Sequence, residues 1–290
     1  MDIKQYLKNY TEFIDQNIDR FLPKGKPSIL FEAMEYSVKA GGKRLRPILV
    51  LESAKALGKN DINDIIDIAV ATEFLHTYSL IHDDLPAMDD DGLRRGKPTS
   101  HIVYGEAIAI LAGDGLQSYA FELISKNEKI HPKKLIKVIN LLAHGTGVFG
   151  MVAGQTADIL HEKEGTFDDI EFIHIHKTAK FIQVCCHIGA ILADASQEEQ
   201  EALANYGLNI GISFQIQDDI LDIEGEEEKL GKKVRKDIEK SKLTYPLVYG
   251  LEESKKLAKK HVQEAISSIE KIKNPEVLIN LAKFIINRDV

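Results

Sequence analysis

The stretch INDIIDIAVATEFLHTYSLIHDDLPAMD, residues 62–89, sets the fold class, because an apolar helical face leads directly into a cluster of acidic side chains. From Ile62 onward the apolar residues recur at the spacing of one face of an α-helix that continues for several turns. These residues are Ile65, Ile66, Ala69, Val70 and Phe74. The stretch therefore predicts a long helix that carries His82, Asp83 and Asp84 at its end.

Two further stretches have the same helical spacing, and alternating β-strand patterns are nearly absent. One stretch runs from Tyr206 to Leu221, and the other runs from Leu251 to Ile269. Short glycine clusters separate the helical stretches, and no long linker rich in proline or serine interrupts the chain. We therefore predict an all-α fold, with residues 1–290 forming a single domain of packed helices.

Composition excludes several other classes of protein. With 290 residues and 44% hydrophobic content the chain can bury a large core, and its formal net charge of −8 argues against generic nucleic-acid binding. The two cysteines, Cys185 and Cys186, are adjacent and poorly placed to bridge each other, so no disulfide framework is expected. No apolar leader follows the N-terminus, and no uninterrupted apolar run reaches the ~18 residues that a membrane span needs. These features predict a cytoplasmic protein without a membrane span.

Two aspartate clusters each follow a long apolar helical stretch, DDLPAMD at 83–89 and DDILD at 218–222. The spacing in the second cluster places its carboxylates within an arc of about 100° on a helix, and Gln215 shares that face. In the first cluster an unbroken helix would put Asp89 about 240° around from Asp83. Pro86 disturbs the preceding turn, however, and a bulge there could bring Asp89 back.

The clustered carboxylates predict a metal site. Converging carboxylates repel one another unless cations bridge them, and hard oxygen ligands select Mg²⁺ or Mn²⁺ over softer metals. Because Mg²⁺ takes only one or two protein carboxylates and completes its shell with water and phosphate oxygens, the clusters point to a diphosphate substrate. A single cluster would be explained most simply as a solvated helix face, but two clusters that abut apolar helices favour metal binding.

Although the net charge of the chain is negative, basic residues that could bind anions occur in small groups. The run GGKRLRP, residues 41–47, combines two glycines, three cations and a proline suited to a first helical turn, so it is a candidate diphosphate cradle. Arg94 and Arg95 follow the first aspartate cluster closely enough to neutralise phosphates held by its metals. His76 lies two helical turns before Asp83 in nearly the same phase, although a histidine in such a place is most often a buried core residue.

The run HTYSLIHDDLPAMDDDGLRRGKP at 76–98, together with GGKRLRP, GQTAD, HKTAK, FQIQDDILD and GKKVRKDIEKSKLTYP, resembles the bacterial farnesyl and geranylgeranyl diphosphate synthases of the short-chain trans-prenyltransferase family. The resemblance covers nearly the whole chain in the family's order. It implies a homodimer whose subunits have the isoprenoid synthase fold, an antiparallel helical bundle around a deep central cavity.

The resemblance also implies the roles of individual residues. Metal ligands, holding about three Mg²⁺ ions with Mn²⁺ able to substitute, are expected at Asp83, Asp84, Asp89, Asp158, Asp218, Asp219 and Asp222. The allylic diphosphate is expected to bind to Arg94, Gln155, Lys177, Lys232 and Lys242. Isopentenyl diphosphate is expected to bind to Gly42, Lys43, Arg46, His76 and Arg95. The catalytic residues are expected to be Asp83, Asp89, Asp218, Lys177, Lys232, Thr178 and Gln215.

The expected reaction is the head-to-tail condensation of isopentenyl diphosphate with dimethylallyl or geranyl diphosphate, which makes the protein a prenyltransferase of isoprenoid biosynthesis. The metals and the cations Lys177, Lys232 and Arg94 would stabilise the departing diphosphate, so that the allylic bond ionises. An apolar cavity would shield the allylic cation from water while isopentenyl diphosphate attacks it. No side chain in the motifs is an obvious base, so the departed diphosphate is the expected proton acceptor.

Product length is expected to depend on residues just before Asp83. On an ideal helix Ser79 lies within about 40° of the direction of Asp83, and Tyr78 lies about 140° away. The family associates an aromatic residue at the position of Tyr78 with a farnesyl-length product, so we predict farnesyl diphosphate. Departures from the family pattern at Phe149 and within residues 177–181 and 241–244 concern the cavity shape, and the geranylgeranyl product remains the alternative.

Two other classes of protein compete with this interpretation. A non-catalytic subunit of a heteromeric prenyl synthase would usually lack one aspartate cluster, whereas this chain has both. A metal-dependent phosphohydrolase would be expected to pair histidines with its aspartates. His82 and Asp83 form one such pair, but no histidine pairs with DDILD.

Overall fold

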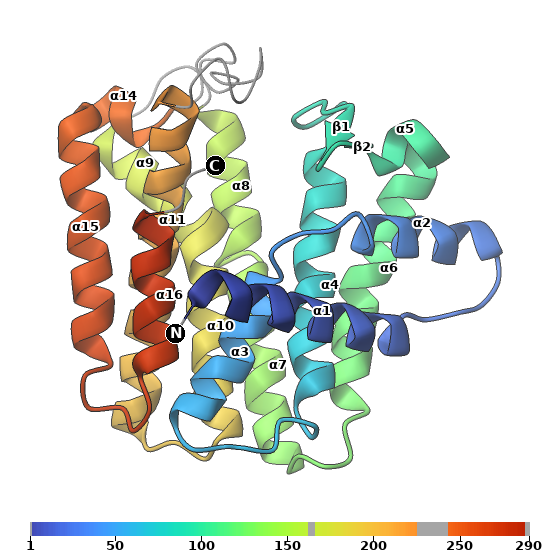
Figure 1. Ribbon diagram of the computed structural model, residues 1–290. Coiled ribbons are helices and arrows are strands. Elements are labelled where there is room, and N and C mark those ends of the chain that lie inside the picture. The colour runs from blue at the N-terminus through green and yellow to red at the C-terminus, as the bar shows by residue number, and fades with distance from the viewer. Residues whose placement is uncertain (1, 162–165, 225–242, 288–290) are drawn as a thin grey trace. The chain divides into compact units, whose positions relative to one another are not determined.

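The computed structural model describes residues 2–161, 166–224 and 243–287 (Figure 1). This part of the chain is helical apart from one hairpin of two short strands, so the all-α prediction is confirmed. The helices are grouped in two compact units. The first comprises Met1–Leu51 and Asn60–Ile139, and the second comprises Glu52–Lys59 and Asn140–Val290. That the whole chain forms a single domain stays a prediction.

The first unit is built around two long helices that pack side by side, α4 (Ile66–Asp83) and α6 (Glu106–Ser125) (Figure 1). The elements that surround this pair are α1 (Ile3–Phe21), α2 (Ser28–Val38), α5 (Ser100–Tyr104), β1 (Leu93–Arg94) and β2 (Lys97–Pro98). Helix α4 begins four residues later than the apolar pattern predicts. It is buried on nearly all sides, because α1, α2 and α6 all pack against it.

The second unit is built around α11 (Gln197–Glu224). Around it lie α8 (Met151–Leu160), α9 (Phe167–Ile173), the π-helix η1 (His174–Ala179), α10 (Lys180–Leu192), α14 (Tyr245–Tyr249), α15 (Leu251–Ser268) and α16 (Glu276–Ile286). The predicted helices at 206–221 and 251–269 correspond to α11 and α15. Two further helices, α3 (Leu45–Ala56) and α7 (Pro132–Thr146), cross the boundary between the units along the chain.

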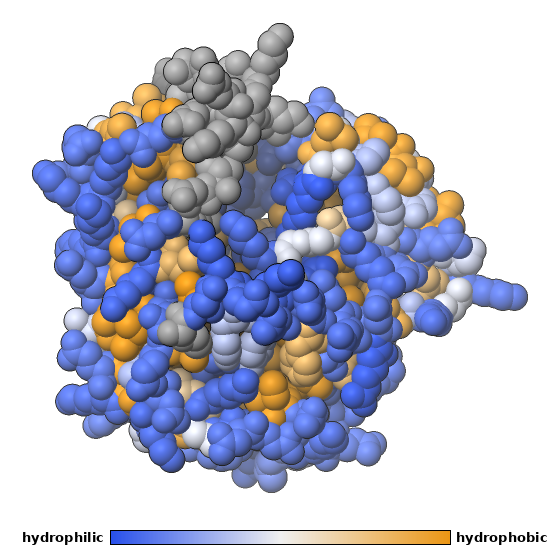
Figure 2. Space-filling view, in the orientation of Figure 1, coloured by the Kyte–Doolittle hydropathy of each residue, from blue (hydrophilic) through white to orange (hydrophobic). Residues whose placement is uncertain are grey.

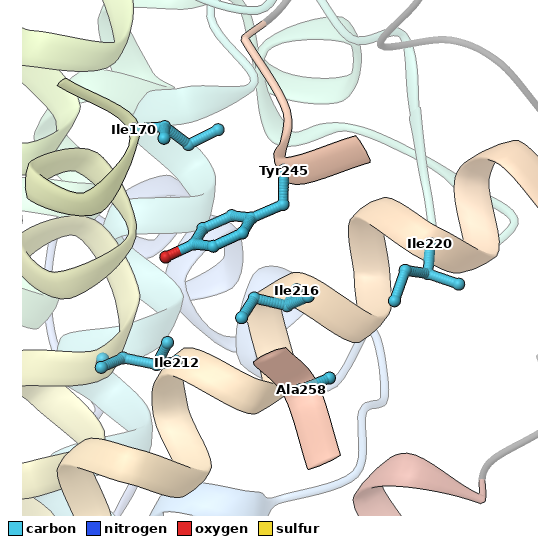
Figure 3. Packing of buried hydrophobic residues seen from close by; sticks show 7 residues of the cluster. Ile170, Ile212, Ile216, Ile220, Tyr245 and Ala258 are labelled. Carbon is cyan, nitrogen blue, oxygen red and sulfur yellow. The ribbon is translucent and has the colours of Figure 1, made fainter. Parts of the chain in front are cut away.

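The core of the second unit next to DDILD is made by branched aliphatic residues of α11 and one aromatic ring. Tyr245 lies among Ile212, Ile216 and Ile170, with Ala258 of α15 closing the cluster (Figure 3). All five are buried, which fixes the face of α11 opposite to the one that carries Asp218. Tight packing here holds the acidic end of α11 in place.

One stretch, Pro132–Leu160, is long and apolar enough to cross a membrane by length and composition alone. The helix of this stretch is interrupted between α7 and α8, where Val148 and Phe149 are exposed. Since a core helix of a soluble protein can pass the same test, the stretch is weak evidence for a membrane span. Cys185 and Cys186 are both buried free thiols, as expected.

Candidate active site

The first aspartate cluster forms where α4 ends. The helix stops at Asp83, and the chain turns back so that the backbone N–H of Asp89 donates to the carbonyl oxygen of Asp83 at 2.9 Å. Asp89 therefore returns beside Asp83, as predicted, although the helix ends before Pro86 and does not bulge. Both aspartates are half-buried and keep accessible surface.

Asp84 has different surroundings from Asp83. It is 4% exposed, and Nε of Arg94 donates to both of its carboxylate oxygens at 2.7 and 3.0 Å. Burial raises the pKa of Asp84, while the Arg94 guanidinium opposes that shift. In this structure Asp84 therefore anchors Arg94, and its role as a metal ligand stays a prediction.

The hairpin of β1 and β2 places Arg95 in a strained turn. Its two turn residues, Arg95 and Gly96, have φ of 53° and 75°, the backbone that tight two-residue hairpins require. A non-glycine residue held there costs on the order of 1 kcal/mol. The strain is retained because the Arg95 guanidinium donates to the carbonyl of Gly41 and lies over Gly42. A Cβ at Gly42 would come within 2.6 Å of that guanidinium, so this contact requires glycine.

The predicted isopentenyl diphosphate residues therefore converge within the first unit. His76 lies in the field of Arg46 and Arg95, and burial followed by these arginines lowers its pKa well below the usual value. The ring is thus neutral near pH 7. Its Nδ1 is buried and makes no hydrogen bond to the described residues. Lys43 is exposed next to Gly42.

Arg44, the third cation of GGKRLRP, is not available to a ligand. It is 3% exposed, and its guanidinium donates to Glu73 Oε1 at 2.9 Å, to Asp15 Oδ1 at 2.8 Å and to the carbonyl of Val38 at 2.9 Å. The cradle therefore offers two cations and not three. Sequence reasoning missed Glu73, although a glutamate inside an apolar helix, three residues before His76, was a usable signal.

In the second unit the π-helix η1 carries Lys177 and Thr178. Such helices are rare and occur frequently at functional sites. Two glycines allow close packing around η1: a Cβ at Gly154 of α8 would overlap the backbone nitrogen of Lys177, and one at Gly211 of α11 would lie 2.6 Å from Cα of Ala179. No pattern in the sequence predicted this π-helix.

The polar side chains around η1 form two pairs. Nζ of Lys177 lies 2.5 Å from Oδ2 of Asp158, and the hydroxyl of Thr178 donates to Oε1 of Gln215 at 3.0 Å. The structure thus brings together Lys177, Thr178 and Gln215, which the resemblance had placed at one site. Asp158 is paired with a cation here, and its role as a metal ligand stays a prediction. Gln155 is half-buried on α8, while Lys232 and Lys242 lie outside the described residues.

The three aspartates of DDILD also differ from one another. Asp219 is 4% exposed, accepts the backbone N–H of Tyr245 at 2.9 Å and lies 3.5 Å from Nε2 of His174. Burial lowers the pKa of His174 to about 3, so that ring is neutral. Asp219 thus ties α11 to the start of α14, and its oxygens are used within the fold. Asp218 and Asp222 lie one turn apart and are half-buried.

The described residues fit divalent cations only as pairs of carboxylates. Across residues 2–161, 166–224 and 243–287, no group of three or more His, Cys, Asp or Glu side chains is arranged to hold a metal ion. Asp83 with Asp89, and Asp218 with Asp222, remain as carboxylate pairs. Since Mg²⁺ typically takes one or two protein carboxylates and leaves its other positions to water and phosphate, these pairs fit its chemistry.

The two residues expected to set product length lie on α4. Tyr78 is 5% exposed, and its ring meets that of His82 edge to face at 5.8 Å. Burial raises the pKa of Tyr78 to about 12, so the phenol stays protonated. The hydroxyl of Ser79 donates to the carbonyl of His76 at 2.9 Å. The influence of these residues on product length stays a prediction.

Comparison with known proteins identifies the family of this chain. Residues 27–281 match the family described as polyprenyl synthetase. The farnesyl diphosphate synthase of Bacillus subtilis (strain 168) is 47% identical over 266 residues, covering 91% of this chain and 86% of that protein. The geranylgeranyl diphosphate synthase of Cyanophora paradoxa is 45% identical over 288 residues, covering 98% and 96%.

Solved structures give the same result. A farnesyl/geranylfarnesyl (FPP/GFPP) synthase from Zymomonas mobilis superposes with a TM-score of 0.86 at 34% identity, covering 98% of this chain and 99% of that chain. The chain belongs to the polyprenyl synthetase family. Within that family it is a trans-prenyl diphosphate synthase, a prenyltransferase of isoprenoid biosynthesis.

Proposed function

We propose that this trans-prenyl diphosphate synthase makes farnesyl diphosphate, by adding isopentenyl diphosphate to dimethylallyl and then to geranyl diphosphate. The observation that carries the proposal is Tyr78, a buried aromatic side chain shortly before Asp83 on α4. A bulky, tightly packed group there would limit the room for a growing prenyl tail. Relatives carry both farnesyl and geranylgeranyl names, so their names support either product.

Isopentenyl diphosphate would be bound by the cationic cluster of Arg46, Arg95 and Lys43. Guanidinium groups bind phosphate oxygens through paired hydrogen bonds, and a glycine at position 42 lets Arg95 approach the backbone. A neutral His76 can hydrogen-bond a phosphate oxygen without adding charge repulsion to its arginine neighbours. These groups would orient the double bond of the nucleophilic substrate.

The allylic diphosphate would be held by Lys177 and Arg94. The family generally depends on divalent metals, and we propose Mg²⁺ at the carboxylate pairs Asp83 with Asp89 and Asp218 with Asp222. When bound, these ions neutralise negative charge on the leaving diphosphate. Arg94 is held in a fixed orientation by Asp84, so its charge is preorganised and needs no reorganisation during the reaction.

Proton loss would end each cycle. The carboxylate of Asp158 is paired with the ammonium of Lys177, and the hydroxyl of Thr178 and the amide of Gln215, which bond to each other, are weak bases. The departed diphosphate is a stronger proton acceptor, and we assign the step to it. The hydroxyl and the amide would instead stabilise positive charge on the reacting carbons through their dipoles.

We also propose that the protein acts as a cytoplasmic homodimer. Apolar side chains of Ile102, Val103 and Leu111 are exposed on α5 and α6, and Figure 2 shows apolar surface over α5. An exposed apolar surface of this kind is typical of a protein–protein interface. Size-exclusion chromatography with light scattering tests the dimer, and a mass of one chain would contradict it.

Product analysis tests the proposed function. The enzyme is incubated with Mg²⁺, isopentenyl diphosphate and either dimethylallyl, geranyl or farnesyl diphosphate, and the products are separated by chromatography. We expect C15 product from the first two starters and little elongation of the third. A main product of C20 would overturn the farnesyl assignment. Release of phosphate without a longer prenyl chain would instead indicate a hydrolase.

A further inference from the structure

Glu73 is a buried carboxylate that the proposed reaction does not use. It lies on α4, three residues before His76, and is 1% exposed. Its Oε1 accepts from Nη1 of Arg44 at 2.9 Å, while its Oε2 is buried and makes no hydrogen bond to the described residues. A buried carboxylate is costly unless nearby cations compensate it, so its surroundings must supply positive charge.

Arg44 provides the first part of that charge and links Glu73 to the substrate loop. Arg44 lies between Lys43 and Arg46, two of the predicted ligands of isopentenyl diphosphate. Its backbone has φ of 48°, a conformation that a non-glycine residue keeps only when its surroundings hold it there. The bonds from its guanidinium to Glu73 and Asp15 supply that restraint. The buried ion pair of Arg44 with Glu73 therefore holds the loop of residues 41–46 in place.

Arg95 provides the second part of the positive charge that compensates Glu73. Burial lowers the pKa of Arg95 and neighbouring arginines lower it further, whereas the charge of Glu73 raises it. The guanidinium of Arg95 also contacts Gly41 and Gly42, which precede Arg44 in the loop that the ion pair with Glu73 holds. One anion in this position reduces the mutual repulsion of the arginines that converge around His76.

We propose that Glu73 is a positioning residue for isopentenyl diphosphate. It anchors the loop of residues 41–46 through Arg44, and the anchored loop holds Arg95 through the contacts of its guanidinium with Gly41 and Gly42. Glu73 touches no substrate in this scheme. The inference rests on the proposed function only in assigning isopentenyl diphosphate to the cationic cluster.

If Glu73 acted only through its negative charge, its removal would change the affinity for isopentenyl diphosphate in the opposite direction, which allows a sharp test. A negative charge close to a diphosphate weakens its binding, so neutralising Glu73 would improve affinity if the residue acted only through its charge. If Glu73 holds the loop and Arg95 in place, neutralising it lowers affinity. The sign of the change separates the two roles.

The test compares Glu73→Gln with Glu52→Gln. Glu52 is also a buried glutamate on a helix, 2% exposed and paired with Lys55, and it has no place in the proposed site. We expect Glu73→Gln to raise KM for isopentenyl diphosphate about tenfold or more, with KM for geranyl diphosphate and kcat within about twofold. The control should leave all three within about twofold. An unchanged or lower KM for isopentenyl diphosphate in Glu73→Gln overturns the proposal.

A binding measurement keeps the inference separate from catalysis. Calorimetric titration of isopentenyl diphosphate in EDTA, with no allylic substrate present, reports on the cationic cluster alone. We expect the Kd to increase in Glu73→Gln and also in Arg44→Lys, which keeps the charge but loses the guanidinium fork. If Glu73→Gln fails to fold, the measurement on Arg44→Lys decides the question. An unchanged Kd for isopentenyl diphosphate in Arg44→Lys overturns the proposal.

The same titration distinguishes failure of the inference from failure of the proposed function. If the unmodified protein binds isopentenyl diphosphate and the variants lose affinity, but no prenyl product forms, the positioning role stands and the proposed reaction fails. If product forms but the variants bind as tightly as the unmodified protein, the reaction stands and the positioning role fails. Absence of any binding by the unmodified protein overturns the positioning role.

Discussion

Asp83 and Asp84 are neighbours in the chain, yet their carboxylates have different surroundings. Asp83 is half-buried at the end of α4 with Asp89 folded back beside it, while Asp84 is buried against Arg94. Successive residues on a helix point about 100° apart, so one of two adjacent aspartates can face the site while the other faces the fold. The structure therefore assigns different roles to identical residues of one motif.

Removing the charge of Asp83 should stop the reaction. We expect Asp83→Asn to lower kcat about a thousandfold, because the proposed Mg²⁺ pair loses one of its two carboxylates. Asp90→Asn is the matched control, since Asp90 is exposed in the same turn and its φ of 51° suits asparagine. Steady-state assays at saturating substrates decide this. A variant that kept more than about a tenth of the rate would contradict the ligand assignment.

The size of the side chain at position 78 should set the product length. We expect Tyr78→Ala to shift the main product from C15 to C20 or longer, because it removes a buried ring shortly before Asp83. Ser79→Tyr should shorten the product. Tyr78→Phe is the control and should keep C15, since it retains the ring. Mass spectrometry of the products checks all three, and an active Tyr78→Ala that still stops at C15 shows that Tyr78 does not limit the tail.

At the scale of the element, the helices were predictable and their irregularities were not. The apolar spacing before Asp83 and before Asp218 predicted α4 and α11, because burial of one face demands that spacing. The π-helix at His174–Ala179 has no comparable signature, since its extra residue is accommodated by packing against other elements. Gly154 and Gly211 were usable hints, because the lack of a side chain matters only where another backbone approaches closely.

Filling the space at Gly154 should displace the π-helix. A Cβ there would overlap the backbone of Lys177, which cannot move without disturbing η1. We expect Gly154→Ala to lower the free energy of unfolding by about 1–3 kcal/mol. It should also reduce kcat, because Lys177 moves with its backbone. Gly92→Ala is the control, since a Cβ at Gly92 meets nothing within 4 Å. Equal stability of the two variants in urea would show that η1 tolerates the added methyl group.

At the scale of the whole molecule, the sequence predicted the family but did not predict the buried ion pair of Arg44 with Glu73. The motifs predicted the all-α fold and most of the residues that converge around His76. Arg44 and Arg46 are the same residue type in one motif, and only the burial of Arg44 against Glu73, 29 residues further along, separates their roles. Such a partner is specified by packing in three dimensions, and local spacing does not reveal it.

The neutral state of His76 should make folding stability depend on pH. Folding depresses the pKa of His76, so below pH ~6.5 this histidine is protonated in the unfolded protein and stays neutral in the folded protein. Stability is therefore complete above that pH and falls as the pH drops below it, by up to about 1.4 kcal/mol per pH unit.

A comparison of variants isolates this contribution from that of the carboxylates. We expect His76→Gln to lose less unfolding free energy between pH 7 and pH 5 than the unmodified protein loses. Urea denaturation at both pH values measures the difference. Identical losses in His76→Gln and the unmodified protein would mean that His76 titrates normally in the folded state.

The contact between Gly42 and Arg95 also constrains how this protein can change over evolutionary time. A side chain at position 42 would push Arg95 away, and a different residue in the hairpin turn would leave the glycine without its partner. Position 42 is restricted in a second way, because its φ of 133° favours glycine even where Arg95 has moved. A lineage is therefore expected to change Arg95 before it changes Gly42, and the glycine should persist among descendants whose surfaces have otherwise diverged.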